Sequence, residues 1–326
     1  MFESKRILIT GGSGSWGNEL TTQLLEKNPK EIIIFSRGEL AQVNMERKFN
    51  NSKLTFTIGD VRDYESVNEA CKNIDYVYHL AALKHVPICE NYPQEAIKTN
   101  IDGTSNLIKA CIKNKVKKFI DVSTDKAVSP SNLYGMTKSV GEKLTIHANK
   151  LTKDTDFICV RGGNVLGSNG SVVPFFIKRI EETNSIDITS NKMTRYFLTL
   201  PEAIKLLFQA TEHSVGGETF VMNMPSFYIK NIAQIIVKKY GNKDTMINNI
   251  GIREGEKIHE TLVSEHESKK TFKFNEDYFV ILPELKIDRD YSYTENLSKV
   301  SFSSFTSLDN IKDNEFLVDL LNKGGF

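Results

Sequence analysis

Short apolar runs alternate with amphipathic stretches over the first two-fifths of the chain. Runs rich in Val, Ile, Leu and Phe predict strands, and apolar residues that recur every three or four positions predict helices. The predicted strands span residues 6–10, 31–35, 54–59, 76–80 and 118–123, and helical patterns lie between them, for example at 18–27 and 104–113. This alternation predicts an α/β fold with a doubly wound parallel sheet, and the nearly continuous apolar strands predict helices on both of its faces.

The pattern loosens after Gly163, where glycines become frequent. Helical patterns recur at 174–182, 200–212 and 230–240, and one further strand is predicted at 219–223. We expect a main domain over residues 1–165, to which segments near 198–224 return, and a smaller C-terminal lobe with a tail over residues 166–326, closing over a ligand. The tail after Asp288 is rich in Ser, Thr, Asn and Asp, a composition typical of loosely ordered chain.

The 326-residue chain has an ordinary globular composition, with 40% hydrophobic and 25% charged residues. Its formal net charge of +1 gives no sign of a nucleic acid or an anionic membrane as partner. The four cysteines lack CxxC spacing and are expected to be buried thiols in a reducing compartment. The chain enters its first predicted strand soon after Met1, and its apolar runs have strand length. We therefore expect a cytoplasmic protein without a secretion signal or a membrane span.

The residues after the first predicted strand read Thr-Gly-Gly-Ser-Gly-Ser-Trp-Gly, with the glycine spacing GxxGxxG. Glycines here permit a tight turn, close approach of the backbone to a pyrophosphate, and close packing of the following helix, whose N-terminus favours negative charge. A glycine triplet alone also fits an ordinary turn, but the strand–loop–helix context favours a dinucleotide site of the Rossmann type. The predicted cofactor-binding residues in this loop are Gly11, Ser13, Gly14, Ser15, Trp16 and Gly17.

The end of the second predicted strand discriminates between NAD and NADP. An acidic residue there would bind the ribose 2′-hydroxyl, whereas an arginine accommodates a 2′-phosphate. The sequence is Phe-Ser-Arg-Gly, so Ser36 and Arg37 predict NADP. Arg37 as a solvated surface residue is the alternative, and the nearby Glu39 leaves NAD open.

The third and fourth predicted strands end in residues that suit the same dinucleotide. Asp60, followed by Val61, could place a carboxylate near the adenine amino group. The small side chains of Ala81 and Ala82, which precede Lys84, let the chain pass close to the cofactor. Each segment alone would also fit an ordinary loop, but their succession in strand order favours a cofactor site.

Tyr134 and Lys138 form a YxxxK pattern shortly after the fifth predicted strand. Residues four apart share one face of a helix, so the ammonium group is expected to stabilise the phenolate and to lower the tyrosine pKa from its ordinary value of about 10. The pattern is common by chance, but after the fifth strand of a dinucleotide fold it predicts the acid–base pair of an oxidoreductase. The sequence shows no spacing typical of a metal site, and His85 and His259 are expected to be structural.

Together these residues resemble the extended short-chain dehydrogenase/reductases, and more closely the soluble UDP-N-acetylglucosamine 4,6-dehydratases of pseudaminic-acid and capsular-sugar pathways. The resemblance covers the chain from about Lys5 to about Leu285. It rests on the segments TGGSGSWG, IFSR, GDVRD, LAALKHVPICE, KTNIDGT, STDKA, NLYGMTK, GNVLGSNGSVVPFF, MTRYFLTLPEA and GIREGEKIHE. Several of these are long and specific.

The resemblance implies a Rossmann fold and an internal redox cycle. Thr124, Tyr134 and Lys138 would suffice for an alcohol dehydrogenase or a 4-epimerase, whereas Asp125 and Lys126 are additional. In the family, the tyrosine takes the 4-hydroxyl proton while hydride leaves C4 for NADP. A neutral Lys126 would then remove the C5 proton, and a protonated Asp125 would assist loss of the 6-hydroxyl as water. Hydride returns to C6, so a tightly bound NADP is recycled. A surface ion pair is the alternative reading of Asp125 and Lys126.

The resemblance also assigns the substrate side of the site, for which a solvated surface position is the alternative reading of each arginine. One departure from the family is Gly162, where the family carries a tyrosine, and it leaves the configuration at C5 open. The residues implied for UDP-N-acetylglucosamine are Lys84, Asn164, Val173, Arg195, Arg253 and Glu256, with the arginines as candidates for the diphosphate, and Asn100 joins the cofactor site.

The resemblance further implies a homo-oligomer, either a dimer or a hexamer. Two other functions stay open. A UDP-sugar 4-epimerase or reductase of the same fold would not need the Asp125-Lys126 pair. A non-catalytic NADP-sensing protein would not need the Tyr134 and Lys138 pair, which this chain retains.

Overall fold

The computed structural model describes residues 1–168 and 170–326. Its centre is a sheet of ten strands in the order β16-β14-β15-β10-β6-β5-β4-β1-β2-β3. In chain order these strands are β1 (Arg6–Thr10), β2 (Glu31–Ser36), β3 (Leu54–Ile58), β4 (Tyr76–His79), β5 (Lys118–Thr124), β6 (Asp156–Gly162), β10 (Thr219–Met222), β14 (Thr271–Lys273), β15 (Tyr278–Ile281) and β16 (Ser298–Lys299). The five strands predicted in the first part of the chain are confirmed, each to within one residue at its end.

The seven strands that lie between β10 and β3 in this sheet order, both included, run parallel to their neighbours. The chain moves outward from β1 through β2 to β3 and then restarts on the other side of β1 with β4. The doubly wound α/β sheet is therefore confirmed. Strands β15, β14 and β16 extend it in antiparallel pairings. In such a sheet ligands bind beyond the carboxyl ends of the strands where the order reverses, here between β1 and β4.

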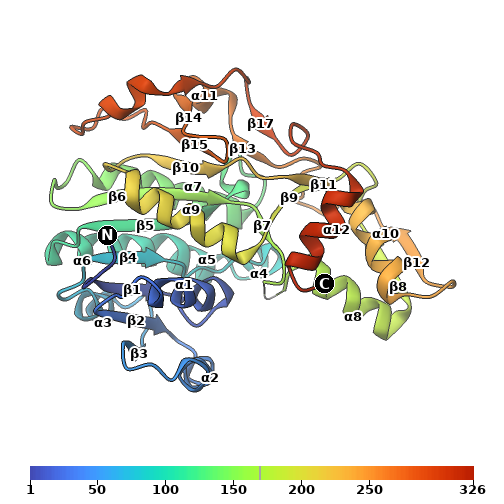
Figure 1. Cartoon of the computed structure of the whole chain (residues 1–326), viewed down its shortest axis with the longest axis horizontal. Helices are drawn as coiled ribbons and strands as arrows, with labels where there is room; N and C mark the ends of the chain where they lie inside the picture. Colours follow the sequence, from blue (N-terminus) through green and yellow to red (C-terminus); the bar gives the residue numbers. More distant parts are fainter. Residues whose placement is uncertain (169) are drawn as a thin grey trace.

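Helices cover both faces of the sheet (Figure 1). Ile7 and Ile9 of β1 are fully buried on one face and Leu8 on the other, as the two-residue period of a strand requires. Leu20 and Leu24 of the first helix are also fully buried, and each contributes about 1.5–3 kcal/mol by leaving water. The helices on the first face are α1 (Ser15–Leu25), α2 (Glu39–Phe49) and α9 (Leu200–His213), and those on the second are α3 (Tyr64–Ala70), α6 (Gly103–Asn114) and α7 (Leu133–Ala148).

Between β4 and α6 the chain forms three short helices, α4 (Val86–Asn91), α5 (Pro93–Ile97) and a π-helical turn at Lys98–Asp102. The π-helical turn runs directly into α6. Such wide turns inside helices are frequent at functional sites.

A smaller lobe lies at one end of the sheet, where Figure 1 shows α8, α10 and α12 together. Its core gathers Phe176, Ile232 and Leu317 from these three helices. Tyr196 packs this lobe against Val221 of β10. Its elements are α8 (Val172–Thr183), α10 (Ile229–Tyr240), α12 (Asn314–Lys323), the pair β8 (Ser185–Ile188) and β12 (Met246–Asn249), and the three-stranded sheet β7 (Asn164–Val165), β9 (Thr194–Leu198) and β11 (Ser226–Tyr228). The helices and the strand predicted after Gly163 are confirmed as α8, α9, α10 and β10.

The prediction of a loosely ordered tail after Asp288 is wrong. The tail supplies β16 to the main sheet, β17 (Phe305–Thr306) to a pair with β13 (Thr261–Val263), and helix α12 to the lobe. Leu317, Leu320 and Leu321 of α12 are buried in the lobe core, so apolar burial outweighs the polar composition around them. The domain boundary at residue 165 stays a prediction, because strands on both sides of it share the main sheet. None of the helices in residues 1–168 and 170–326 combines the length and apolar character needed to cross a membrane.

Candidate active site

The glycine loop between β1 and α1 forms a closely packed turn. Gly11 has φ +66°, and a Cβ atom there would lie 2.8 Å from the backbone nitrogen of Ala81, just after β4. A Cβ at Gly17 would lie 2.1 Å from the carbonyl oxygen of Gly12. Gly14 precedes α1, which begins at Ser15 with no acidic side chain in its first turn. The loop therefore has the close contacts predicted for a pyrophosphate cradle, at a helix N-terminus that favours an anion.

The end of β2 lies beside this loop. The hydroxyl groups of Ser13 and Ser36 are 2.9 Å apart, and the Gln42 amide donates to both the carbonyl and the hydroxyl oxygen of Ser36 at 3.0 Å. The Arg37 side chain is 55% exposed, and its Nη1 atom is 4.0 Å from Asp60 Oδ2. An exposed, charged guanidinium thus lies beside two hydroxyl groups near the strand end, which is an arrangement suited to a phosphate.

Asp60, expected near the adenine, has its carboxylate engaged by Arg62. Arg62 donates to Asp60 Oδ2 through Nε at 2.8 Å and Nη2 at 2.6 Å, and it also pairs with Glu95. Burial acts to raise the Asp60 pKa, but the hydrogen bonds and charge of Arg62 outweigh it and leave the pKa lowered. Val61 is buried against Gly103 at the start of α6, where a Cβ would lie 2.7 Å from Val61 Cγ2. The contact of both residues with the cofactor stays a prediction.

Asn100 holds the segment after β4 in place. Its side chain accepts a hydrogen bond from the Leu83 amide at 2.8 Å, and donates to the Leu83 carbonyl at 2.9 Å and to Thr137 Oγ1 on α7 at 3.0 Å. Ala81 and Ala82 are half-buried within this segment, and Lys84 is exposed. The polar groups of Asn100 are thus used within the protein, which places it behind the predicted cofactor-binding backbone.

The predicted catalytic residues meet where β5 ends and α7 begins. Thr124 Oγ1 donates to Asp125 Oδ1 at 2.9 Å, and Lys126 Nζ donates to the same oxygen at 3.0 Å. Thr124 also makes a side-chain hydrogen bond with Tyr134. Gly135 lets α7 approach this turn, because a Cβ there would lie 2.1 Å from the Lys126 carbonyl oxygen. Asp125 is fully buried, so the reading of Asp125 and Lys126 as a surface ion pair is excluded.

The pKa of Tyr134 differs from the expectation. Burial raises the pKa above its ordinary value, and the positive charges of Lys138 and Lys126 offset only part of the rise. Lys138 donates to Asp121 Oδ1 at 2.9 Å, and both side chains are at most 3% exposed. The paired carboxylate weakens the field that the Lys138 ammonium group exerts on the phenol. The prediction of a lowered tyrosine pKa is therefore wrong for this arrangement.

Lys126 is a charged group in this site. Burial acts to lower its pKa, but the carboxylates of Asp125 and Glu260 outweigh burial, and the pKa is raised. The sequence expectation of a neutral amine therefore requires a proton to leave Lys126 first. Asp125 Oδ1, which already accepts a hydrogen bond from Lys126 Nζ at 3.0 Å, can accept that proton.

The predicted substrate residues fall into two groups. Asn164 reaches the catalytic cluster, where its Oδ1 atom accepts from Lys126 Nζ at 3.4 Å. Arg195 is buried, and its guanidinium donates to the carbonyl oxygens of Thr194 and Lys257 at 2.8 and 2.9 Å. The Arg195 guanidinium, which was expected to bind a diphosphate, thus already donates to backbone carbonyl oxygens.

The remaining substrate predictions lie in different environments. Arg253 is exposed, and its backbone amide donates to Glu256 Oε2 at 3.1 Å, so the pair forms a turn at the surface. Val173 is fully buried in the lobe core on α8. Gly162 lies under the ring of Trp16, since a Cβ at Gly162 would be 3.3 Å from Trp16 Cη2. The indole therefore fills space that a larger residue at Gly162 would need.

Comparison with known proteins identifies the family. The family model described as polysaccharide biosynthesis protein matches residues 7–282. The chain belongs to this family. It is 45% identical to a UDP-N-acetylglucosamine 4,6-dehydratase (inverting) of Campylobacter jejuni (strain 81-176) over 301 residues, which cover 91% of this chain and 88% of the relative. A UDP-glucose 4-epimerase of Rickettsia prowazekii is also 45% identical, over 276 residues that cover 83% of this chain and 81% of the epimerase.

A solved structure supports the same relationship. The X-ray structure of Pen from Bacillus thuringiensis superposes on this chain with a TM-score of 0.92 at 36% sequence identity, and the match covers 100% of this chain and 99% of that chain. The structural similarity thus includes the C-terminal tail, beyond the residues that the family model matches.

The sequence predictions missed two residues that belong to the site of this polysaccharide biosynthesis protein. Glu260 Oε1 lies 3.6 Å from Lys126 Nζ, and Asp121 pairs with Lys138. Asp121 had a visible signal, because an acid between the apolar residues Ile120 and Val122 of a buried strand needs a partner. Glu260 ends the segment GIREGEKIHE, on which the resemblance partly rests, but its distance from Lys126 in the sequence hid the contact between them.

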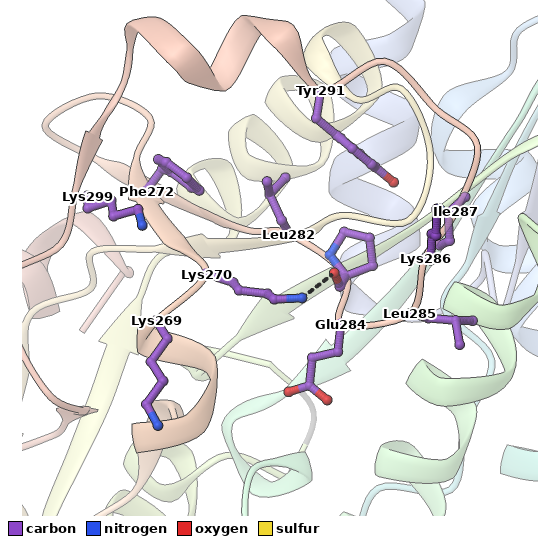
Figure 2. A pocket seen from close by; sticks show the side chains of 11 residues that line it. Lys269, Lys270, Phe272, Leu282, Glu284, Leu285, Lys286, Ile287, Tyr291 and Lys299 are labelled. Carbon is purple, nitrogen blue, oxygen red and sulfur yellow. Dashed lines mark hydrogen bonds between the residues drawn. The ribbon is translucent and has the colours of Figure 1, made fainter.

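A surface hollow of about 420 Å³ lies away from these residues, beside β14 and β15. Figure 2 shows Lys270 reaching across it to donate to the Pro283 carbonyl oxygen, at 3.3 Å. Its lining contains none of the residues predicted for cofactor, substrate or catalysis. Within the described part of the chain, no group of three His, Cys, Asp or Glu side chains is placed to hold a metal ion.

Proposed function

We propose that the protein is a UDP-N-acetylglucosamine 4,6-dehydratase, which converts this sugar nucleotide to UDP-2-acetamido-2,6-dideoxy-hexos-4-ulose and water. The similarity to the inverting dehydratase of C. jejuni supports the proposal. The observation that carries it is the buried hydrogen bond of 3.0 Å between Lys126 Nζ and Asp125 Oδ1, next to Thr124 and Tyr134. This pair supplies the base and the acid that loss of water requires and that epimerisation does not.

We propose NADP as the cofactor. The packed glycine turn at Gly11 and Gly17 leaves the backbone free to approach a pyrophosphate at the N-terminus of α1. Arg37, at the end of β2, suits a 2′-phosphate, because Asp60 already has Arg62 as its closer partner. A dinucleotide bound here would supply the hydride exchange that oxidation at C4 and reduction at C6 of the sugar require.

The protein's own residues move the protons of the elimination. Transfer of one proton from Lys126 to Asp125, along the hydrogen bond that joins them, converts the ion pair into an amine and a carboxylic acid. Burial lowers the cost of this transfer, because neither product carries a charge. The amine takes the C5 proton and the acid donates a proton to the leaving 6-hydroxyl, which departs as water. Lys126 is then an ammonium group again and returns its proton to C5.

Tyr134 completes the proton balance. Because burial keeps its pKa raised, the phenol must first lose a proton, which the charges of Lys138 and Lys126 favour, and the resulting phenolate takes the 4-hydroxyl proton when C4 is oxidised. After Lys126 has protonated C5, the Asp125–Lys126 pair lacks one proton and Tyr134 holds it. Thr124 hydrogen-bonds to both Tyr134 and Asp125, so the proton has a path back and each residue regains its starting state.

The reaction is tested by incubating the purified protein with UDP-N-acetylglucosamine in D₂O without added reductant. We expect NMR to show a 4-keto-6-deoxy product with deuterium at C5, because the C5 proton is exchanged on Lys126. Lys126→Met and Asp125→Asn should each slow dehydration by about 10²-fold or more while C4 oxidation persists. Recovery of only the C4 epimer from the wild-type protein would refute the dehydratase proposal.

The epimerase is the second candidate, because a UDP-glucose 4-epimerase is equally similar in identity and Tyr134 with Lys138 would suffice for it. An epimerase should tolerate both substitutions of the Asp125–Lys126 pair.

The choice of NADP over NAD is tested at Arg37. Arg37→Ala should reduce the preference for NADP by about tenfold or more, because one charge-assisted contact with the 2′-phosphate is lost. Arg47→Ala, at an exposed position on α2, is the matched control. Equal losses in both variants, or none in either, would contradict a role for Arg37. We also propose a cytoplasmic location, which the four free, buried cysteine thiols support.

A further inference from the structure

Glu260 stands between the catalytic turn and the C-terminal tail. Its Oε1 atom is 3.6 Å from Lys126 Nζ and 3.6 Å from Arg195 Nε. Its backbone is fixed by Ser307, whose hydroxyl accepts from the Glu260 amide at 3.0 Å and whose own amide donates to the Glu260 carbonyl at 2.8 Å. The tail therefore places this carboxylate beside Lys126.

The Glu260 carboxylate is deeply buried, like that of Asp125. The Glu260 side chain is 4% exposed and that of Asp125 is fully buried. Neither Asp125 Oδ2 nor Glu260 Oε2 has a hydrogen-bond partner among the residues that the structure describes. Two buried carboxylates, each with one unpaired oxygen, are costly for the fold, and such groups gather at functional sites.

We propose that Glu260 is a positioning residue for Lys126: together with Asp125 it holds the Lys126 ammonium group and makes Lys126 a stronger base toward C5 of the sugar. This inference rests on the proposed dehydratase function. Asp125 exchanges protons with Lys126, whereas Glu260 acts through its charge and touches neither reacting atom.

The effect follows from the charges that surround Lys126. Asp125 and Glu260 carry negative charge, and Arg195 and Lys257 carry positive charge. Arg195 is fixed by backbone carbonyl oxygens and would stay in place without Glu260. Removal of the Glu260 charge would therefore leave Lys126 facing a buried cation with one anion fewer, which disfavours its protonated form. Removal of the charge would ease the earlier loss of a proton from Lys126, but abstraction of the C5 proton by the amine creates the protonated form again, so that step would slow.

The first test measures the protonation of Lys126 directly and needs no catalytic turnover. The rate at which an amine-acylating reagent modifies Lys126 is followed against pH by peptide mass spectrometry, because only the neutral amine reacts. In Glu260→Gln the midpoint of this profile should fall by at least about one pH unit. Glu254→Gln, an exposed neighbour in the same segment, should leave it unchanged. An unchanged midpoint in Glu260→Gln would overturn the inference.

The second test separates the steps of the reaction. Glu260→Gln should lower kcat for dehydration about tenfold or more with little change in KM, and C4 oxidation in a single turnover should be unaffected. Glu260→Asp keeps the charge and should recover most of the rate. If Glu260→Gln does not fold, Glu260→Asp carries the test, with a smaller fall of the labelling midpoint expected. A rise in KM without a fall in kcat, or no recovery of the rate in Glu260→Asp, would show a merely structural role.

The inference and the proposed function fail in different ways. Absence of the 4-keto-6-deoxy product with wild-type protein refutes the function, whatever the labelling shows. A wild-type protein that dehydrates, with a Glu260→Gln variant that matches it in labelling and in kcat, refutes the role of Glu260 alone.

Discussion

The ion pair between Arg161 and Glu267 should make the fold sensitive to acid. Arg161 lies on β6 and is buried, and it donates to Glu267 through Nη2 at 2.6 Å and Nη1 at 3.0 Å. Burial acts to raise the Glu267 pKa, but the charge and hydrogen bonds of Arg161 outweigh it and lower the pKa from 4.5 to about 2. The Glu267 side chain is only 18% exposed, so solvent screens the pair little.

The stability follows from the difference between the two pKa values. A shift from 4.5 to about 2 corresponds to about 3 kcal/mol of stabilisation of the folded state. The folded pKa lies below the unfolded one, so this stabilisation is complete at pH values well above 4.5 and is lost as the pH falls toward 2. At pH 3 about two-fifths of it should remain.

Glu267→Gln removes the charge with little other change. Glutamine can still accept from Ser264, which caps helix α11 (Glu265–Ser268), so the capping box is retained. Urea unfolding is followed by the fluorescence of Trp16, the single tryptophan. The variant should lose about 3 kcal/mol of unfolding free energy at pH 7, and the loss should shrink at pH 3.

The control for this experiment is Glu265→Gln on the same helix, where the side chain is exposed. It should change the unfolding free energy by less than about 0.5 kcal/mol. If Glu267→Gln behaves like this control at pH 7, or if its loss is the same at pH 7 and pH 3, the electrostatic reasoning is wrong.

Three further substitutions test the packing of the site. Gly11→Ala should weaken dinucleotide binding about tenfold or more in calorimetry, because the residue has φ +66° and its Cβ would lie 2.8 Å from backbone after β4; unchanged affinity would contradict the cradle. Asp121→Asn should lower the unfolding free energy by about 3–5 kcal/mol, because Lys138 would be left as an unpaired buried cation; a stable variant in urea titrations would show that the pair is not needed. Gly162→Tyr should reduce thermal stability, since its Cβ would be 3.3 Å from Trp16, and Trp16→Ala in the same chain should restore part of the loss; no restoration would place the conflict elsewhere.

The parts of the fold that sequence predicts well have local causes. Strands β1 to β5 are apolar runs bounded by turn residues, and the glycine loop is contiguous with the strand and helix that it joins. The tail shows the opposite case. Leu317, Leu320 and Leu321 have helical spacing, but the polar residues before them dominate the composition, and their burial depends on α8 and α10, which lie far away in the chain. Composition alone could not show that α8 and α10 provide an apolar surface against which these leucines pack.

The site shows the same division. Thr124, Asp125 and Lys126 are adjacent in sequence, and the helical spacing of Tyr134 and Lys138 fixes their common face, so their meeting was predictable. Their protonation was not. The raised pKa of Tyr134 depends on how deeply the phenol is buried, and that of Lys126 depends on a carboxylate brought from the other half of the chain. Sequence indicates which side chains can exchange protons, whereas burial and neighbouring charges in the folded structure set their protonation states.

The number of linked proton carriers favours dehydration over epimerisation. Oxidation and re-reduction at C4 need one group that accepts and returns a proton, and Tyr134 alone could serve. Loss of water needs two more, a base at C5 and an acid at C6, and a route that restores them between turnovers. Asp125 and Lys126 share a hydrogen bond of 3.0 Å, and Thr124 joins that pair to Tyr134. A chain that only epimerised would gain nothing from burying a charged pair at this point, and such burial is costly. The buried pair is therefore better explained by elimination than by C4 chemistry alone.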